Sequence, residues 1–315
     1  MKAAGTTATP RRVPGVELLS QGGHKVQRFT VLILTVLPLL GLTVAIATLW
    51  GRGLGLLEAS LFVSFYFFTG FGVTIGFHRM LTHQSFKARP VTRAVLAIAG
   101  SMSLQGSVIS WVATHRRHHA FSDQAGDPHS PHVESEEGIK GILKGLWHAH
   151  LGWLFDPEQT SPERWAPDLL KDPVMVKINR WFPALGILSF ALPPMIAFVI
   201  TRSYAAALMT FLWASLARIF LLHHVTWSIN SICHFYGKRP FESPDHSTNN
   251  WMLSILSMGE SWHNNHHAFP TSARHGILRG QIDPSALVIR LLEKLGLVED
   301  VKAPSSAQLE SRKAA

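Results

Sequence analysis

Cysteine and charged side chains are both scarce in this chain of 315 residues. The one cysteine, Cys233, excludes an intramolecular disulfide and any zinc or iron–sulfur site that is built from several thiolates. Charged residues make up 16% of the chain, against roughly 25% in an average soluble domain, and the mean hydropathy is +0.16. The composition therefore argues against a soluble protein and against disorder, and a bound metal must be held by groups other than thiolates.

Acidic residues are also few, 20 against 29 Lys and Arg, which gives a formal net charge of +9. A surplus of Lys and Arg is typical of proteins that bind nucleic acid. Here, however, the positive residues lie on the flanks and in the loops of apolar stretches, as membrane topology requires. We therefore expect a membrane protein with no nucleic-acid partner.

Four apolar runs are long enough to cross the ~30 Å hydrocarbon core of a bilayer. They cover residues 29–50, 54–77, 181–201 and 204–227. The very short connections at Arg52 and Arg202 predict two helical hairpins. A further apolar stretch, 91–114, contains Arg93 and Gln105, and we expect it to lie at the membrane interface or inside the protein. The fold class is therefore an all-α integral membrane protein with four spans and a helical cap.

Hairpins return the chain to the side from which it came, so the N-terminus, residues 78–180 and residues 228–303 share one face. By the positive-inside rule this face is cytoplasmic, because the N-terminal segment has only Glu17 against five cations, Lys2, Arg11, Arg12, Lys25 and Arg28. We divide the chain into a flexible basic segment (1–28), a membrane domain (29–303) and a flexible tail (304–315).

Histidine is abundant, with 18 residues, and many stand in clusters. Residues three and four apart share one face of a helix, whereas a pair five apart needs a helix end or an irregular turn. Asn230 and His234, just beyond the last span, are four apart. The three clusters are His78 with His83, His115 with His118 and His119, and His263 with His266 and His267.

All these groups fall on the predicted cytoplasmic side, although the topology was argued without them. Imidazole suits iron, copper and zinc, and the nitrogens outnumber what one tetrahedral zinc ion uses. Nine histidines suit two metal ions, and the sequence predicts a dinuclear site.

Together, these motifs resemble the integral-membrane fatty acid desaturases, specifically the Δ9 acyl-CoA/acyl-lipid branch. The resemblance covers about 54–301. It includes the segments 76–83 (GFHRMLTH), 111–119 (WVATHRRHH), 127–129 (DPH), 150–153 (HLGW), 226–234 (TWSINSICH) and 259–270 (GESWHNNHHAFP).

The resemblance implies two iron ions that use O2 and two electrons to place a cis double bond, at Δ9, in a saturated acyl chain such as stearoyl or palmitoyl. It implies that Gln105, Trp111, Thr226 and Trp227 line a substrate tunnel. It also implies a metal site formed by His78, His83, His115, His118, His119, His234, His263, His266 and His267, with Asn230 reaching a metal through water.

A compact chain of this kind is expected in a bacterial plasma membrane, with electrons from a separate ferredoxin, cytochrome or NAD(P)H-dependent reductase. Ala113 and Thr114 stand where the animal stearoyl-CoA enzymes have an Arg-Asp pair, and Gly106 replaces a coenzyme-contacting Asn. The acyl carrier therefore stays open between CoA, a lipid and a carrier protein.

Two other functions remain as alternatives. A di-iron hydroxylase or oxygenase would use the same kind of site, and spacing does not separate it from a desaturase. A His-rich metal transporter needs ligands at membrane depth, whereas nearly all the clusters lie beyond the ends of the spans.

Other polar residues near the clusters have open roles. Asp123, Asp127 and Glu260 either orient imidazoles or make ordinary loop hydrogen bonds. Arg218 lies inside an apolar run and needs a partner. His223 and His224 are equally compatible with supporting the site and with structural burial. We interpret the remaining histidines as structural, namely His24, His132, His148, His246 and His275.

Overall fold

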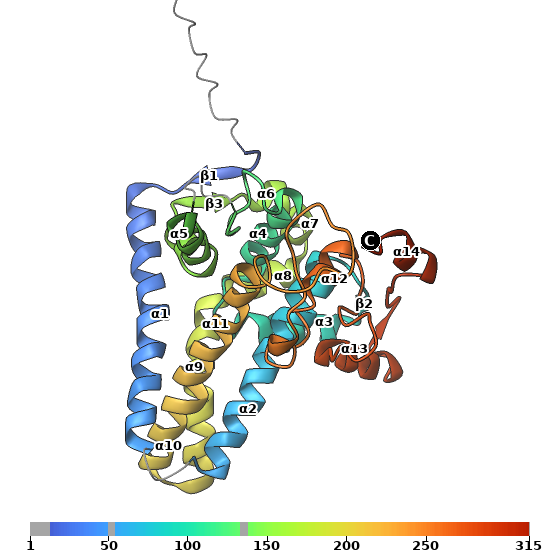
Figure 1. The fold of residues 1–315 in the computed structure, drawn as a ribbon. Helices are drawn as coiled ribbons and strands as arrows, with labels where there is room; N and C mark the ends of the chain where they lie inside the picture. Colours follow the sequence, from blue (N-terminus) through green and yellow to red (C-terminus); the bar gives the residue numbers. More distant parts are fainter. Residues whose placement is uncertain (1–12, 50–53, 133–137, 315) are drawn as a thin grey trace, which may run out of the picture.

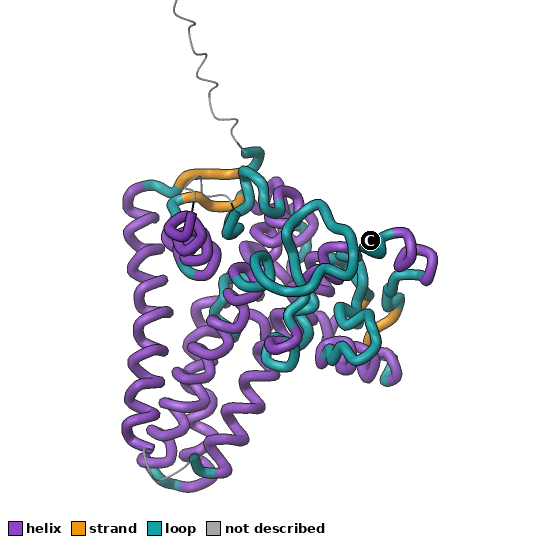
Figure 2. Tube along the Cα trace, viewed as in Figure 1, coloured by secondary structure: helices purple, strands orange, loops and turns teal. Residues whose placement is uncertain are grey.

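The computed structural model describes residues 13–49, 54–132 and 138–314, and the described chain is mostly helical (Figures 1 and 2). Lys2, Arg11, Arg12 and Arg52, on which the predictions of topology and of the first hairpin partly depend, lie outside the described residues. Among the described residues, four helices are long and apolar enough to cross a membrane, which confirms the prediction of four such segments.

The four long helices correspond to the predicted apolar runs, and all except Phe182–Thr201 extend beyond their run at one end. They are α1 (Gln21–Leu49), α2 (Leu56–Phe71) continued by η1 (Gly72–Thr82), α9 (Phe182–Thr201), and α10 (Tyr204–Thr210) continued by η3 (Phe211–Ala217) and α11 (Arg218–Ser231). The helices that contain the runs 54–77 and 204–227 continue past the apolar residues. Their polar ends are buried in the cap and do not meet water. Figure 1 shows the end of α1, the start of α2 and the α9–α10 connection at one end of the molecule.

The remaining elements form a cap at the opposite end. Short strands pair antiparallel, β1 (Val16–Leu18) with β3 (Glu158–Thr160) and β2 (Lys87–Ala88) with β4 (Val298–Glu299). The helices are α3 (Pro90–Ser101), α4 (Val108–Phe121), α5 (Gly138–His150), η2 (Gly152–Phe155), α6 (Pro162–Trp165), α7 (Pro167–Leu170), α8 (Pro173–Arg180), η4 (Trp251–Leu253), α12 (His263–Ala268), α13 (Pro284–Lys294) and α14 (Ser306–Ser311).

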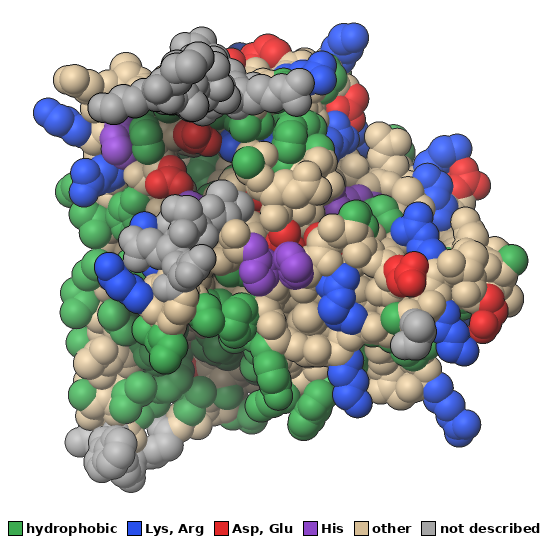
Figure 3. All heavy atoms as spheres, turned by 45° about the horizontal axis from the view of Figure 1, so that its top comes forward, with side chains coloured by type: hydrophobic (Ala, Val, Ile, Leu, Met, Phe, Trp, Pro, Cys, Tyr) green, Lys and Arg blue, Asp and Glu red, His purple; other side chains and the backbone are tan. Residues whose placement is uncertain are grey.

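The long helices differ in how they are buried. In the most apolar 18-residue stretch of each helix, 17% of α1 and 22% of α9 is buried inside the protein. The corresponding shares are 56% for α2–η1 and 50% for α10–α11. Hydrophobic side chains gather over the long helices in Figure 3, while Lys and Arg side chains gather over the cap. This division is what a bilayer around the long helices requires.

The core packs η1 against α3 and α4 through Phe77, Leu96 and Val112. Gly72 allows the close approach, because a Cβ at this position would lie 2.0 Å from the backbone nitrogen of Gly100. The stretch 91–114 forms α3 and α4 in this cap, and neither is a candidate span.

Arg218 is fully buried at the η3–α11 junction. Its guanidinium donates to the carbonyl and hydroxyl oxygens of Ser189 on α9, at 3.1 and 2.9 Å, and to the Thr69 hydroxyl on α2. The partners that the sequence left open are therefore neutral oxygens on two neighbouring helices.

Ordered structure lies within both segments that the sequence predicts to be flexible. α1 already begins at Gln21, and two short elements, β1 and α14, also form there. β1 is held by its pairing with β3. α14 begins with a capping box, in which the Ser305 hydroxyl accepts from the Gln308 amide while the Gln308 side chain accepts from the Ser305 amide.

Candidate metal centre

Nine histidine side chains form two groups where the long helices enter the cap. Within each group, the candidate ligand atoms all lie within 4.8 Å of one another. The five-histidine group contains His78, His83, His115, His119 and His266, and the four-histidine group contains His118, His234, His263 and His267. These are the nine histidines that the sequence predicts to act together.

Each His-x-x-His-His cluster contributes to both groups. On α4, His115 and His119 face the five-histidine group, while His118 faces the four-histidine group. On α12 the division is reversed, because His263 and His267 join the four-histidine group and His266 joins the other. The i, i+4 pair of each helix shares one face, and the third histidine points to the neighbouring group.

His78 and His83 lie at the end of η1, which has π-helical hydrogen bonding. The His83 amide donates to the His78 carbonyl, five residues back, at 3.1 Å. A π-turn holds one more residue than an α-turn, so this pair reaches the same group although an α-helix would separate the two rings. The irregular geometry that the spacing predicts is thus a π-helix.

The nitrogens of these rings fit a metal. The Nε2 atoms of His78 and His119 both lie 3.0 Å from His266 Nε2, and His234 Nε2 lies 2.9 Å from His263 Nε2. The buried Nε2 atoms of His83 and His267 have no hydrogen-bond partner. Imidazole nitrogens that converge in this way offer lone pairs that a cation would satisfy, and such a donor set suits zinc, copper, iron or nickel.

The electrostatics keep most of these imidazoles neutral at pH 7. Burial, reinforced by the neighbouring imidazoles, lowers the pKa of most rings that lie outside the spans. It lowers the pKa of His267 to about 4 even though Asp245 opposes the shift. The pKa is well below its usual range for His83, His115, His119, His263 and His266. Neutral imidazole is the form that binds a metal.

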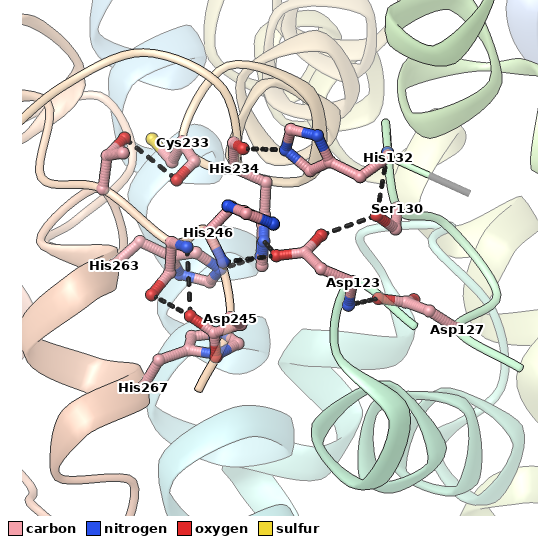
Figure 4. Close-up of polar contacts among 12 residues, drawn as sticks. Asp123, Asp127, Ser130, His132, Cys233, His234, Asp245, His246, His263 and His267 are labelled. Atoms are coloured by element: carbon pink, nitrogen blue, oxygen red, sulfur yellow. Dashed lines mark hydrogen bonds and ion pairs between the residues drawn. The ribbon is translucent and has the colours of Figure 1, made fainter. Parts of the chain in front are cut away.

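Carboxylates hold the outer nitrogens of four rings. In the four-histidine group, Nδ1 of His118 donates to Asp127 at 2.9 Å and Nδ1 of His234 donates to Asp123 at 2.8 Å. His267 Nδ1 donates to Asp245 at 2.5 Å. Figure 4 shows His234 turned toward Asp123 and Asp245 lying beside His267. Each bond fixes the ring orientation and leaves Nε2 directed into the group.

In the five-histidine group, His78 Nδ1 lies 2.5 Å from Glu260. Glu260 also accepts from Arg79 at 3.1 Å, and Arg79 forms a second buried ion pair with Asp283 at 3.1 Å. Arg79 in addition donates to Nδ1 of His275, whose ring centroid lies 4.5 Å from that of His266.

Burial alone would raise the pKa of Asp123 and Asp127, but hydrogen bonds and adjacent imidazoles outweigh it and hold both pKa values below their usual range. Burial lowers the pKa of His118, and the Asp127 carboxylate overcomes this effect and raises it. These carboxylates are therefore charged at neutral pH.

A cavity of about 350 Å³ reaches both histidine groups. All four predicted tunnel residues, Gln105, Trp111, Thr226 and Trp227, line it. The Gln105 amide donates to the Thr226 hydroxyl at 3.0 Å, and the Trp111 ring stacks on His115 with 4.9 Å between centroids. The two histidine groups and the predicted tunnel residues thus border the same cavity.

Further wall residues include His78, His115, His263 and Asn230. Asn230 therefore faces the space beside the histidines. His223 also lines the cavity, and its Nε2 donates to the Ser103 carbonyl at 2.8 Å.

Sequence reasoning missed several residues of this site. Asp245 and Asp283 carry no motif. Arg79 lies within the segment 76–83, but its spacing gave no sign of a partner 204 residues away, Asp283. His275, interpreted as structural, lies in the same buried network through its bond to Arg79. Three carboxylates near the clusters, Asp123, Asp127 and Glu260, gave a local signal, because the sequence offers them as residues that orient imidazoles.

Comparison with known proteins identifies the family to which a chain with these histidine groups belongs. The family model for fatty acid desaturases matches residues 54–277. The chain is 42% identical over 285 residues to a hex-5-enoyl acyl-carrier-protein acetylenase of Moorena producens, covering 90% of this chain and 89% of that protein. It is 41% identical over 240 residues to an acyl-CoA C20 Δ5-desaturase of Anemone leveillei, covering 75% and 70%.

A third relative is the sn-1 stearoyl-lipid 9-desaturase of Anabaena variabilis, which is 36% identical over 241 residues, covering 76% of this chain and 81% of the relative. The chain belongs to the membrane fatty acid desaturase family. Family membership and the histidine groups support an oxidoreductase that binds metal and acts on acyl substrates, and the four apolar helices agree with a membrane protein.

Proposed function

We propose that this protein is a fatty acid desaturase that uses O2 and two electrons at a di-iron centre to introduce a cis double bond at Δ9 into a saturated acyl chain. Stearoyl and palmitoyl chains, carried as a thioester or in a lipid, are the proposed substrates. The observation that carries the proposal is one cavity whose wall contains members of both histidine groups. The four predicted tunnel residues, Gln105, Trp111, Thr226 and Trp227, line the same cavity.

Two iron ions would be held by the five-histidine and four-histidine groups, with Asn230 contributing through water. Removing hydrogen from two adjacent methylenes requires a strong oxidant, and iron with O2 supplies this chemistry. The protein holds the acyl chain in the cavity with the target carbons at the histidine groups. The hydrogen bond between Gln105 and Thr226 fixes their positions in the cavity wall.

We further propose that the four spans form two hairpins in a bacterial plasma membrane, with both termini and the metal site cytoplasmic. The end of α1, the start of α2 and the α9–α10 connection lie at the end of the molecule opposite the cap, which supports this arrangement (Figure 1). A ferredoxin, cytochrome or NAD(P)H-dependent reductase would then deliver electrons to the cap.

The relatives agree in acting on acyl chains, but they differ in the carrier to which the acyl chain is attached. Their names specify an acyl-carrier protein, CoA and a lipid, and their double or triple bonds differ in position. Both the Δ9 position and the carrier are therefore parts of the proposal that need direct measurement.

The test is a single turnover with purified protein in lipid nanodiscs. The protein is loaded with iron, reduced with dithionite and exposed to O2 with stearoyl-CoA or stearoyl phospholipid, and the products are analysed by mass spectrometry with double-bond localisation. A cis-Δ9 product with iron, and none with zinc, supports the proposal. Hydroxylated chains would favour an oxygenase, and no product from an iron-loaded protein would contradict the proposal.

A further inference from the structure

The two histidine groups differ in how their outer nitrogens are bonded. In the four-histidine group, three of the four rings donate to a carboxylate, namely His118, His234 and His267. In the five-histidine group, His78 is the one ring with a carboxylate contact among the residues that the structure describes. This difference does not depend on which metal is bound.

The carboxylates of the two groups also differ in whether a neighbouring cation compensates their negative charge. Glu260, at the five-histidine group, forms an ion pair with Arg79 at 3.1 Å. This guanidinium, which also pairs with Asp283 at 3.1 Å, offsets part of the Glu260 charge. The remaining partners of Asp123 and Asp245 are neutral donors. Asp123 accepts from the Ser130 hydroxyl and the His246 amide, and Asp245 accepts from hydroxyls of Ser243 and Ser247.

Asp127 follows the same pattern, because it accepts from the backbone amides of Asp123 and His129. Over the described residues, the four-histidine group is thus surrounded by three carboxylates with no Lys or Arg ion pair. The five-histidine group has one carboxylate in contact with its rings, Glu260, and Glu260 and Asp283 share the positive charge of Arg79. Less uncompensated negative charge therefore lies beside this group.

From this asymmetry we infer that the two metal positions are electronically unequal, and that the four-histidine position stabilises the more positive ion. The inference rests on the proposed di-iron function. When the centre takes up one electron, the iron at the five-histidine position becomes ferrous and the iron at the four-histidine position stays ferric.

Two physical effects act in the same direction. A carboxylate that accepts the outer N–H raises the basicity of the imidazole toward a metal. Negative charge close to the ion in a buried site also favours the ferric over the ferrous state, because the attraction grows with the charge of the ion. Asp123, Asp127 and Asp245 are therefore positioning residues that also set the reduction potential of one iron.

The test uses the full-length protein in nanodiscs, loaded with ⁵⁷Fe and titrated with dithionite, which donates one electron to each ferric ion. Mössbauer spectra follow the two irons during the titration. We expect two components that are reduced one after the other. Equal reduction of both components throughout the titration would contradict the inference.

Asp123→Asn identifies the position. Asp123 has φ of 58°, a left-handed conformation that Asn also tolerates, so the fold should persist. We expect the component that is reduced last to shift and to be reduced earlier, and the iron affinity of that position to fall roughly 10- to 100-fold. Asp245→Asn provides a second variant with the same expectation.

Glu260→Gln is the matched variant at the other group, and it should alter the component that is reduced first. Asp300→Asn, in an exposed ion pair with Lys87, should alter neither. If Asp123→Asn and Asp245→Asn leave the last-reduced component unchanged, or move the same component as Glu260→Gln, the inference is wrong. A protein that binds iron and shows no asymmetry leaves the desaturase proposal standing, whereas a protein that binds no iron contradicts that proposal itself.

Discussion

The amide of His83 donates to the carbonyl of His78 at 3.1 Å, which closes a π-helical turn and brings two rings five residues apart to one metal group. The same helix packs in close contact with α3 near its start, since Gly72 lies against the backbone of Gly100. The geometry of the site therefore depends on helix packing as well as on the histidines.

Gly72→Ala should disturb this packing. The added methyl would lie 2.0 Å from a backbone atom of Gly100, and forcing helices apart in a packed core costs about 1–3 kcal/mol. We expect a lower melting temperature and less bound iron per protein, measured by thermal unfolding and elemental analysis. Gly22→Ala, with open space at its Cβ, is the control. Equal iron content in both variants would show that the contact does not shape the site.

Asp283→Asn should strongly destabilise the protein. Arg79 is fully buried, and Asp283 accepts from its guanidinium and from the amides of His275 and Ala286. Removing one partner of a buried ion pair costs about 3–5 kcal/mol. Thermal unfolding should show a large loss, in contrast to Asp300→Asn in its exposed pair. Similar melting temperatures for the two variants would contradict the role of the buried network.

Iron-free protein should lose stability as the pH falls from about 6.5 toward 4. The pKa of His267 is about 4 in the folded state against an unfolded value near 6.5, so the unfolded chain binds more protons in this window and stability decreases with acidification. His83, His115 and His119 act in the same direction.

His118 opposes this trend, because its pKa is raised, but it is outnumbered by the rings with lowered pKa values. Melting temperatures between pH 4 and 7 would provide the measurement. A melting temperature that stays constant or rises on acidification across this window would refute the prediction.

Gln105→Leu should reduce the precision with which the double bond is placed. The substitution removes the 3.0 Å hydrogen bond to Thr226 within the cavity wall, which is worth about 1 kcal/mol. We expect products with double bonds at neighbouring carbons, seen by mass spectrometry. Gln159 also lines the cavity, but its side chain donates to the adjacent Glu158 carbonyl. The Gln159→Leu variant should therefore still place the double bond at a single position. An unchanged product pattern in Gln105→Leu would count against its role in the tunnel.

The sequence predicts the four long apolar helices and the nine clustered histidines because both signals are local. Apolar runs report their own length, and the i, i+3 and i+4 spacings report a shared helix face. The ends of α2–η1 and α10–α11 could not be predicted in this way, since hydropathy falls where a helix leaves the bilayer even if the helix continues into the cap.

The carboxylates that hold the imidazoles could be predicted from the sequence only in part. Asp127 stands near His118 in the chain, and its bond to that ring was foreseeable as one of two roles. Asp245 and Asp283 meet His267 and Arg79 only after the cap has folded, and no local pattern marks them. The division of each His-x-x-His-His cluster between two metal groups likewise depends on how α4 and α12 face each other.

The most direct test of the desaturase proposal is the fatty acid profile of cells that express this protein together with an electron donor. Cells expressing His118→Ala are compared with cells expressing His148→Ala, a histidine outside both metal groups. We predict cis-monounsaturated chains with the double bond at Δ9 for the parent and for His148→Ala, and none for His118→Ala. An unchanged profile for the iron-loaded parent, or hydroxylated chains in place of unsaturated ones, would contradict the account.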